Sequence, residues 1–261
     1  MYFVRMNVQL EYENRDERLT VADGVHAHSA IMHTLSNMNP EAGRKLHDIA
    51  RHKPMSIAIL NGTDHDARLQ LTFMADEGLE YVNLLMNGFS ARSHLQIGET
   101  ICKIAGVDLG NSKLAAISTW ADLLSGPHGY YLEFRFRTPT AISKTDNDGK
   151  RFFSLFPVPL DVFSGLARRW ESLHGPSLPG DLQDFIHKGG CVVTKHRLRT
   201  TSFHTSRRTQ IGFIGSVTYT FLEKIPSYVA AINALARLAA FTGIGYQTAR
   251  GMGAVNIRIS R

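Results

Sequence analysis

Alternating apolar and polar residues at the start of the chain predict a β-strand. Between residues 2 and 11, Val4, Met6 and Val8 stand at every second position, which places them on one face of an extended segment. Apolar residues then recur at intervals of three and four over residues 24–38, the period of an amphipathic helix. The same reasoning predicts strands at 54–60, 67–74 and 95–106 and a helix at 77–89. The first half therefore has the order β-α-β-β-α-β.

The second half of the chain repeats this order. Leu132, Phe134 and Phe136 alternate with charged residues in a strand that is predicted at 130–137. The remaining predicted elements are a helix at 160–174, strands at 190–199 and 211–222, a helix at 226–241 and a strand at 254–260. Two copies of β-α-β-β-α-β predict an α+β protein of two tandem ferredoxin-like domains, a topology that RNA-recognition modules also use. Glycines interrupt the pattern between residues 107 and 128, so we place the domains at 1–125 and 126–261.

The composition is that of an ordinary globular protein. With 261 residues, of which 43% are apolar and 20% charged, the chain can bury two cores of normal size. No apolar run reaches the ~20 residues that a membrane helix needs, and the first residues do not resemble a signal sequence. We therefore expect a cytoplasmic protein with no membrane partner. Cys102 and Cys191 lie far apart in strand-like segments, which favours buried thiols over a disulfide or a zinc site.

The net charge is distributed unevenly between the two predicted domains. Residues 1–125 carry 11 Lys and Arg against 15 Asp and Glu, a net of −4, whereas residues 126–261 carry 18 against 8, a net of +10. A domain with this excess of positive charge attracts polyanions, because each neutralised phosphate releases condensed counterions. The second domain is therefore the candidate for binding nucleic acid, although basic domains without such ligands are common.

A glycine-rich loop separates the last predicted helix from the last predicted strand. Its glycines are Gly243, Gly245, Gly251 and Gly253, and its polar side chains include Gln247 and Arg250. Glycines permit a positive φ and a close approach of another backbone, so that successive N–H groups can hold phosphates. A long turn whose glycines serve only packing explains the same pattern. A dinucleotide-binding fingerprint is excluded, because Thr248 stands at the third glycine position and the loop follows a helix.

A second basic feature runs along one of the predicted strands and into the loop that follows it. Lys195, Arg197 and Arg199 alternate along the strand, which places them on one face, and Arg207 and Arg208 stand in the loop. Cationic side chains in this arrangement contact phosphates, and an aromatic residue in the same segment can stack on a base. A solvated loop is the alternative interpretation.

A histidine and a lysine near the boundary between a predicted helix and a strand indicate proton-transfer chemistry. His47 stands beside Asp48 at the end of a short helix, and Lys53 precedes the next strand. A histidine transfers protons near neutral pH, and a lysine stabilises the extra negative charge on a phosphate under attack. Asp48 either orients a histidine or is a solvated carboxylate. His26 and His28 point about 200° apart on a helix, so we expect no metal site and no cofactor.

Several of these motifs together resemble one group of proteins. The pattern Gly-apolar-Gly-x5-Gly-apolar-Gly before a C-terminal strand resembles the signature loop of the repeat-associated mysterious protein superfamily. Other stretches are similar to the CRISPR-associated endoribonucleases of that superfamily, which cut repeat RNA. These stretches are Leu46-His47-Asp48 with Lys53-Pro54, residues 134–140, residues 156–159 and residues 212–215. Each alone is weak, but they occur in order over most of the chain.

The resemblance implies both functional residues and a reaction. His47 occupies the position of the family's catalytic histidine, and Lys53 that of its lysine. The family's third residue is often a tyrosine on the preceding helix, where this chain reads Ile31-Met32-His33, so His33 is the candidate substitute. The division of acid and base roles therefore stays open. The implied products are a 2′,3′-cyclic phosphate and a 5′-hydroxyl, formed by attack of a ribose 2′-OH without a metal ion.

Three functions are compatible with this combination of features. The first is a metal-independent endoribonuclease that binds and cleaves CRISPR repeat RNA in precursor transcripts. The second is a non-catalytic RNA-binding subunit of a CRISPR effector complex, which shares the fold and the glycine-rich loop but needs no pair of His47 and Lys53. The third, an unrelated ferredoxin-like metabolic enzyme, leaves the +10 domain unexplained. Repeat RNA is the expected partner, and effector subunits and a second copy of the chain are further candidates.

Overall fold

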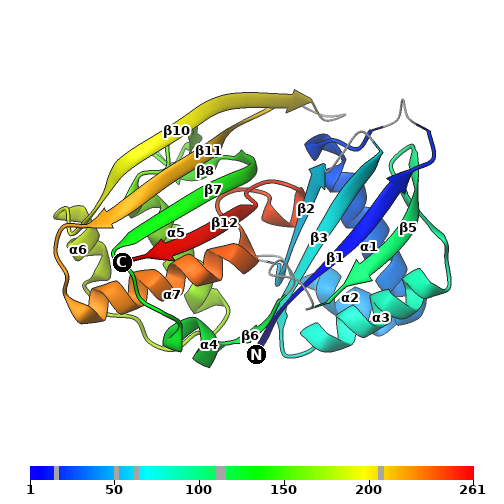
Figure 1. The fold of residues 1–261 in the computed structure, drawn as a ribbon, viewed down its shortest axis with the longest axis horizontal. Coiled ribbons are helices and arrows are strands. Elements are labelled where there is room, and N and C mark those ends of the chain that lie inside the picture. The colour runs from blue at the N-terminus through cyan, green and yellow to red at the C-terminus, as the bar shows by residue number, and fades with distance from the viewer. Residues whose placement is uncertain (15–17, 50–52, 62–64, 110–115, 205–208) are drawn as a thin grey trace. The chain divides into compact units, whose positions relative to one another are not determined.

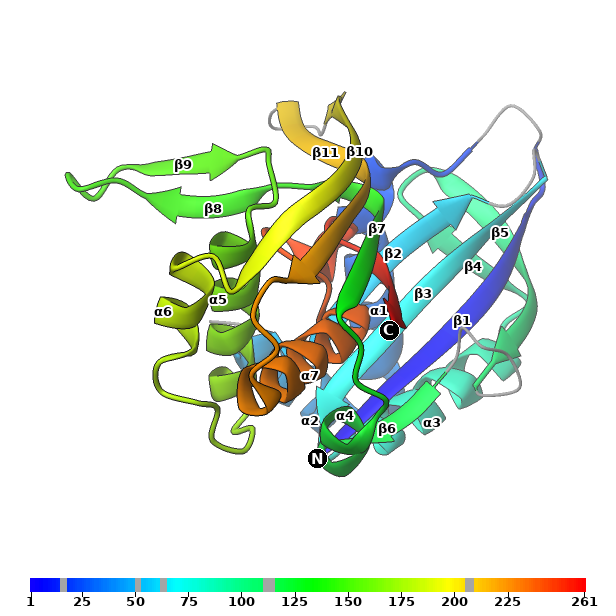
Figure 2. The same ribbon diagram turned by 60° about the vertical axis from the view of Figure 1, so that its left-hand side comes forward.

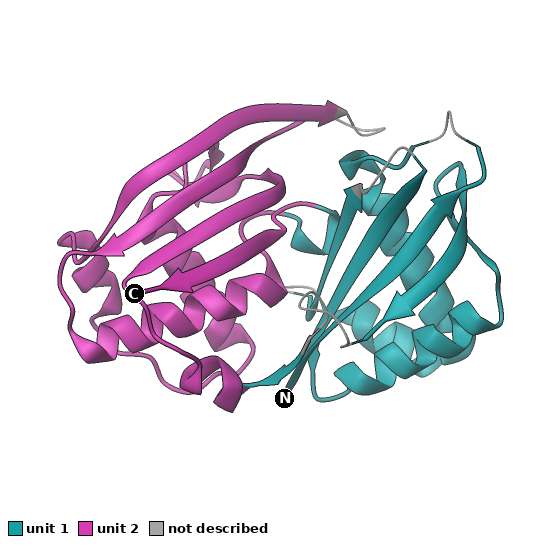
Figure 3. Ribbon diagram, viewed as in Figure 1, with its two compact units in different colours: residues 1–119, 247–251 teal, residues 120–246, 252–261 magenta. Residues whose placement is uncertain are grey.

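The computed structural model describes residues 1–14, 18–49, 53–61, 65–109, 116–204 and 209–261 (Figure 1). The chain forms two units (Figure 3), which are Met1–Thr119 with Gln247–Gly251 and Trp120–Tyr246 with Met252–Arg261. The first unit thus includes a short segment of the glycine-rich loop, and the rest of that loop belongs to the second. None of the described helices has the length and apolar character needed to cross a membrane.

The sheet of the first unit is antiparallel. Its strands are β1 (Tyr2–Tyr12), β2 (Met55–Asn61), β3 (Asp66–Ala75), β4 (His94–Ile97), β5 (Thr100–Asp108) and β6 (Ala116–Thr119). They pair in the order β2-β3-β1-β5-β4, and β6 also pairs with β1. The helical elements are η1 (Val21–Asp23), α1 (Gly24–Met38), α2 (Pro40–Asp48) and α3 (Gly78–Ser90). The central position of β1 between β3 and β5 is that of the first strand in a ferredoxin-like sheet.

The alternation along β1 determines the core of the first unit. Val4, Met6 and Val8 are fully buried, in one cluster with Ile31 and Leu35 of α1. Burial of each such side chain contributes about 1.5–3 kcal/mol. Apolar residues recur at every second position in β1 and at every third or fourth position in α1. These repeats therefore determine which faces of the strand and the helix meet.

One predicted strand of the first unit is wrong. The segment that was expected to form a single strand at 95–106 is a hairpin of β4 and β5. The chain reverses direction at Gly98, whose φ of 64° is unfavourable for residues with a side chain. The ferredoxin-like order is unaffected, because β5 pairs with β1 as the predicted strand would have done.

The second unit repeats the arrangement around a central β7. Its main sheet contains β7 (Tyr131–Thr140), β10 (Cys191–His204), β11 (Thr209–Phe221) and β12 (Val255–Ser260), paired antiparallel in the order β10-β11-β7-β12. Helices α5 (Pro159–Ser172) and α7 (Pro226–Thr242) each begin with a proline, which suits the first helical position. In the core, the rings of Phe134, Phe163 and Tyr219 meet edge to face at 5.0–5.9 Å. The prediction of two tandem ferredoxin-like domains is confirmed.

The second unit also contains short elements that were not predicted. They are α4 (Trp120–Ser125), α6 (Leu182–His187), β8 (Ile142–Thr145) and β9 (Arg151–Ser154). Strands β8 and β9 form a separate two-stranded sheet, and Figure 2 shows this hairpin projecting from the rest of the unit. An ion pair of 2.9 Å between Lys144 Nζ and Asp161 Oδ1 connects the hairpin to α5. The sequence did not predict these four elements because each has only four to six residues, which is too few to show a periodic pattern of apolar positions.

The two cysteines are buried free thiols, as predicted. Burial raises the pKa of the Cys191 thiol to about 12, which keeps it protonated and unreactive. Within the described residues, no three His, Cys, Asp or Glu side chains are grouped so that they could hold a metal ion.

Candidate functional site

The C-terminal end of α2 brings the predicted histidine and lysine together. The side chain of Asn39 caps the start of this helix, and the buried Leu46 anchors its last turn. His47 follows Leu46 and is exposed. Lys53 Nζ donates hydrogen bonds to the carbonyl oxygens of His47 and Leu46, at 2.9 and 3.3 Å, so that a cation lies at the negative end of the helix dipole. These bonds hold Lys53 next to His47.

A second histidine, His28 of α1, belongs to the same cluster although no motif marks it. Gly24 precedes it by one turn and Met32 follows by one turn, so His28 lies within the buried stripe of the helix. A hydrogen bond with the backbone of Ala249 connects its ring to the glycine-rich loop. Its Nδ1 is buried and has no hydrogen-bond partner among the residues that the structure describes. A buried nitrogen without a hydrogen bond is uncommon in folded proteins.

The surroundings of His28 keep it uncharged. Burial, followed by the positive charges of Lys53 and Arg250, lowers the pKa of His28 from 6.5 to about 4, and His47 adds a smaller effect. Burial and Arg250 also lower the pKa of Lys53, whereas Asp48 acts in the opposite direction. At neutral pH the cluster therefore combines a neutral imidazole that can accept a proton with two neighbouring cations. An anion bound among these cations would reduce their mutual repulsion.

Arg250 reaches this cluster because part of the glycine-rich loop belongs to the first unit. Residues Thr248–Arg250 form the short helix η2, which contacts α1 and β2. The backbones approach closely: a Cβ on Gly24 would overlap the carbonyl oxygen of Arg250, and a Cβ on Gly251 would lie 3.0 Å from the Gly24 Cα. Gly251 also has a φ of 97°. These two glycines let η2 lie against α1, and this contact places Arg250 near His28.

The other glycines of the loop pack it within the second unit. Gly243, Gly245 and Gly253 have φ values of 68°, 85° and 75°. The Ile244 N–H donates to the Gly253 carbonyl at 2.9 Å, and the Gly253 N–H donates to the Pro139 carbonyl at 3.0 Å. All four predicted glycines thus have a positive φ, for which packing and backbone hydrogen bonding are a sufficient cause. Their predicted contact with a phosphate stays a prediction.

We expect Gly245→Ala to destabilise the protein more than Gly149→Ala. Both glycines have a positive φ, 85° and 78°, at which a side chain costs roughly 1–2 kcal/mol. At Gly245 the new Cβ would also overlap the carbonyl oxygen of Ala141, whereas no described atom lies within 4 Å of a Cβ at Gly149. Thermal unfolding of the two variants measures the difference. Equal decreases in Tm would show that the loop adjusts without strain.

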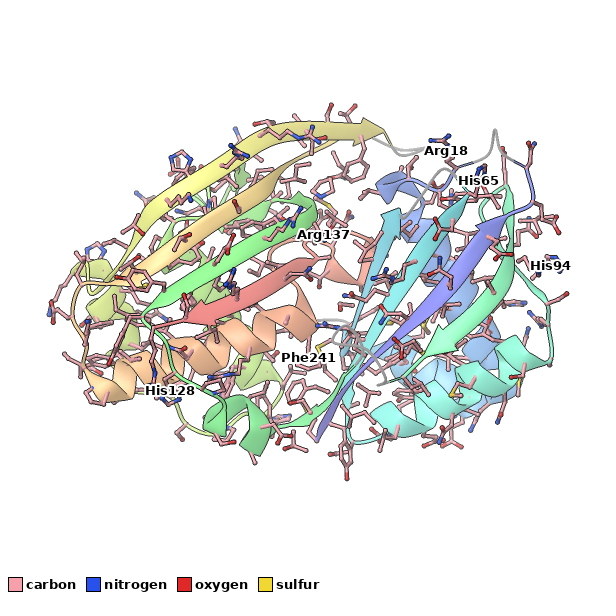
Figure 4. All side chains as sticks on the ribbon, viewed as in Figure 1. Arg18, His65, His94, His128, Arg137 and Phe241 are labelled. Atoms are coloured by element: carbon pink, nitrogen blue, oxygen red, sulfur yellow. The ribbon has the colours of Figure 1, made fainter. Side chains whose placement is uncertain are left out.

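Three further residues, His33, Asp48 and His94, contact residues outside the cluster or interact only weakly with it. His33 is exposed, and its Nε2 lies 3.0 Å from the side-chain amide of an asparagine one turn later. Asp48 Oδ1 lies 3.5 Å from His47 Nδ1, and both side chains are exposed, so their attraction is weak. His94, labelled in Figure 4, lies on the edge strand β4, where its Nε2 is 2.8 Å from Glu13 Oε1.

The face of the second sheet opposite its core is basic. Lys195, Arg197 and Arg199 are exposed on β10, and their alternation places them on one face, as predicted. The strand register puts Arg197 in one row with Ser216 of β11 and Arg135 of β7. Strands two positions apart are separated by roughly 10 Å, so the two arginines of this row are near neighbours.

Three arginines extend this surface beyond the predicted residues. Arg135 and Arg137 alternate with the buried phenylalanines of β7, and Arg258 is exposed on β12 (Arg137 is labelled in Figure 4). We refer to Lys195, Arg197, Arg199, Arg135, Arg137 and Arg258 together as the basic sheet face. The alternation of β7 was visible in the sequence, but the strand order that places β7 beside β11 was not. The predicted Arg207 and Arg208 lie outside the described residues, and Gln247 in the loop has a left-handed backbone with a φ of 57°.

Residues 134–255 match the family described as CRISPR-associated endoribonuclease Cas6. The match covers 122 of the 261 residues and makes this part of the chain similar to Cas6. The matched segment begins in β7 and includes most of the basic sheet face. It also includes the whole glycine-rich loop and residues 134–140, 156–159 and 212–215, which carry the resemblance. This similarity supports an RNA-cleaving enzyme of CRISPR systems and speaks against the unrelated metabolic enzyme.

Solved Cas6 structures have the same fold. The product complex of Cas6 TTHB231 from Thermus thermophilus is similar with a TM-score of 0.83 and 24% identity, over 98% of this chain and 100% of that one. The product complex of Cas6 TTHA0078 gives a TM-score of 0.79 and 22% identity, over 99% and 100%. A Cas6-related protein of Pyrococcus furiosus gives 0.68 and 14%, over 98% of each chain. No curated protein matches the chain.

Proposed function

We propose that this chain binds CRISPR repeat RNA in precursor transcripts and cuts it by attack of a ribose 2′-OH, without a metal ion. The cluster of His28, His47, Lys53 and Arg250, in a chain that matches the Cas6 family over residues 134–255, carries this proposal. The cluster combines groups that transfer protons with groups that stabilise negative charge, and the reaction requires both. Similar proteins include Cas6 in product and substrate mimic complexes and a RAMP protein binding different RNA substrates, which supports RNA as the ligand.

His28 is suited to act as the general base. A base must be unprotonated before the reaction, and the surroundings of His28 hold it neutral at neutral pH. Its half-buried imidazole is the group that would accept the proton of the 2′-OH. An RNA phosphate near the ring would raise the pKa of His28, because a negative charge stabilises the imidazolium that forms. We assign this role to His28 rather than to His33, which is exposed and bonded within its own helix.

His47 then acts as the general acid. The 2′-oxygen forms a bond to phosphorus while the bond from phosphorus to the 5′-oxygen breaks, and His47 gives a proton to the departing oxygen. His28 has taken up the proton of the 2′-OH, so one proton is gained and one is lost by the protein. Lys53 and Arg250 stabilise the additional negative charge on the phosphate during attack. The products are a 2′,3′-cyclic phosphate and a 5′-hydroxyl.

The basic sheet face and the loop residues Gln247 and Arg250 are the proposed contacts to the RNA backbone. The second half of the sequence carries a net charge of +10, and on β7, β10 and β12 part of it is displayed on one surface. Such contacts give affinity that is independent of RNA sequence and that decreases with salt concentration. We place this activity in the cytoplasm. CRISPR effector subunits and a second copy of the chain are further proposed partners.

Incubation of the purified protein with end-labelled repeat RNA in EDTA is expected to produce one discrete cut. A 2′,3′-cyclic phosphate on the upstream fragment would block enzymatic 3′-end ligation until a phosphatase removes it, which identifies the chemistry. Tight binding without cleavage, both in EDTA and with added Mg²⁺, would instead support the non-catalytic subunit of an effector complex. Cleavage that requires a divalent cation would contradict the proposed mechanism and leave only the assignment of RNA as substrate.

A further inference from the structure

An aromatic and cationic cluster lies at the β8–β9 hairpin, outside the residues that have been assigned to RNA cleavage. The ring centroids of Phe153 and Tyr246 are 5.1 Å apart. The guanidinium of Arg151 lies over both rings, 4.7 Å from the centroid of Tyr246 and 5.4 Å from that of Phe153. Arg151 Nε also donates to Ser143 Oγ of β8 at 2.6 Å, which fixes the side chain in this orientation. All four residues belong to the second unit.

Packing does not account for these rings. Phe153 is 39% exposed, and Phe156, just after the hairpin, is 41% exposed and meets the ring of His196 on β10 edge to face at 5.5 Å. The hairpin pairs with none of the other described strands, and Ile142 is the one buried side chain of β8 and β9, so the exposed ring of Phe153 stabilises no core. Exposed aromatic rings that are held next to a cation are instead typical of surfaces that bind bases of single-stranded nucleic acid.

We propose that Phe153, Tyr246 and Arg151 form a stacking site for an unpaired base of RNA. Aromatic rings stack on any base, and the guanidinium supplies charge that is complementary to the adjacent phosphate. The neighbouring segments favour RNA as the occupant. Tyr246 directly precedes Gln247 of the glycine-rich loop, which is one of the proposed RNA contacts. The inference rests on the proposed function, because that function provides the RNA.

Two labelled probes separate stacking from charge. One is an oligoadenylate of about 12 nucleotides, and the other is a strand of the same length with abasic riboses, which has the same phosphates and no bases. We expect the wild-type protein to bind the oligoadenylate at least ~10-fold more tightly. Phe153→Leu retains an apolar side chain but loses the ring, so it should lose most of this preference while binding the abasic strand as before. Phe153→Tyr retains the ring and should retain the preference.

Phe152→Leu is the matched control on the same strand. Phe152 pairs with Lys144 and Phe153 pairs with Ser143, so their side chains point to opposite faces of the hairpin. The control should keep the wild-type preference for oligoadenylate. The proposal is overturned if the wild-type protein does not distinguish the probes, or if Phe153→Leu keeps the preference. If the protein cuts repeat RNA in EDTA but does not prefer oligoadenylate, only the proposed stacking site is contradicted. If it prefers oligoadenylate but does not cut repeat RNA, only the proposed cleavage is contradicted.

Discussion

Replacing His47 by alanine is expected to slow cleavage of repeat RNA by ~10²–10⁴-fold, the usual effect of losing a general acid or base. The side chain is 76% exposed, so its removal should leave the folded state intact. Lys53 bonds to the backbone carbonyl of His47 rather than to its ring, so this cation stays in place in the variant. RNA affinity should change little, because the basic sheet face is unaltered. Single-turnover rates and fluorescence anisotropy measure the two quantities separately.

His94→Ala provides a control for the loss of an exposed histidine. His94 lies on β4, pairs with Glu13 and has no proposed role, so this variant should cleave at the wild-type rate. If His47→Ala also retained the wild-type rate, His47 would not be the general acid. If its rate and its RNA affinity decreased in proportion, His47 would be a binding residue instead.

The long elements of the fold could be predicted because each has a buried face that leaves a period in the sequence. Helix α1 has the bounds that its apolar spacing predicts, Gly24–Met38, and β12 begins one residue later than expected. The predicted strand at 95–106 failed because a single glycine with a positive φ, Gly98, divides an otherwise strand-like segment into two strands. In β8 and β9 only Ile142 is buried, so the hairpin left no period to detect.

The sequence predicted only the part of the candidate site whose residues are close together along the chain. His47 and Lys53 are close in sequence, and their spacing at the end of a helix was enough to associate them. Arg250 stands far from both and reaches them because η2 lies against α1 and β2. Its place in the glycine-rich loop suggested a phosphate contact but gave no information about the residues beside it.

His28 was missed although the sequence carried a signal for it. It lies in line with Gly24 and Leu35 on the stripe of α1 that is otherwise buried and apolar. A histidine within an apolar stripe is most often a satisfied core residue, so the stripe alone could not assign a function. The decisive observations are the unpartnered Nδ1 and the charges of Lys53 and Arg250, and both depend on the tertiary structure.

Replacing His28 by asparagine is expected to slow cleavage by a factor similar to that of His47→Ala, ~10²–10⁴-fold. Asparagine is polar and of comparable size, so it suits the half-buried position, but it cannot take up the proton of a 2′-OH. It is also uncharged, as His28 is at neutral pH, so Lys53 and Arg250 keep the same electrostatic environment. Tm and RNA affinity should therefore remain near the wild-type values in this variant.

The pH dependence of cleavage gives a second measurement of the same role. A general base works only when it is unprotonated, so the wild-type rate should decrease as the pH falls through the pKa of His28. That pKa is about 4 in the free protein and should be higher when an RNA phosphate lies beside the ring. The residual activity of His28→Asn should lack this decrease, which a purely structural role of His28 would leave in place.

His33→Ala decides between the two histidines of α1. His33 stands where the family resemblance placed the third catalytic residue, but its ring is exposed and bonded within the helix. The charges of Lys53 and Arg250 instead act on His28 and lower its pKa. We therefore expect His33→Ala to cleave at close to the wild-type rate when His28→Asn does not. If the opposite result were obtained, the base would come from the exposed face of α1, and His28 would have no catalytic role.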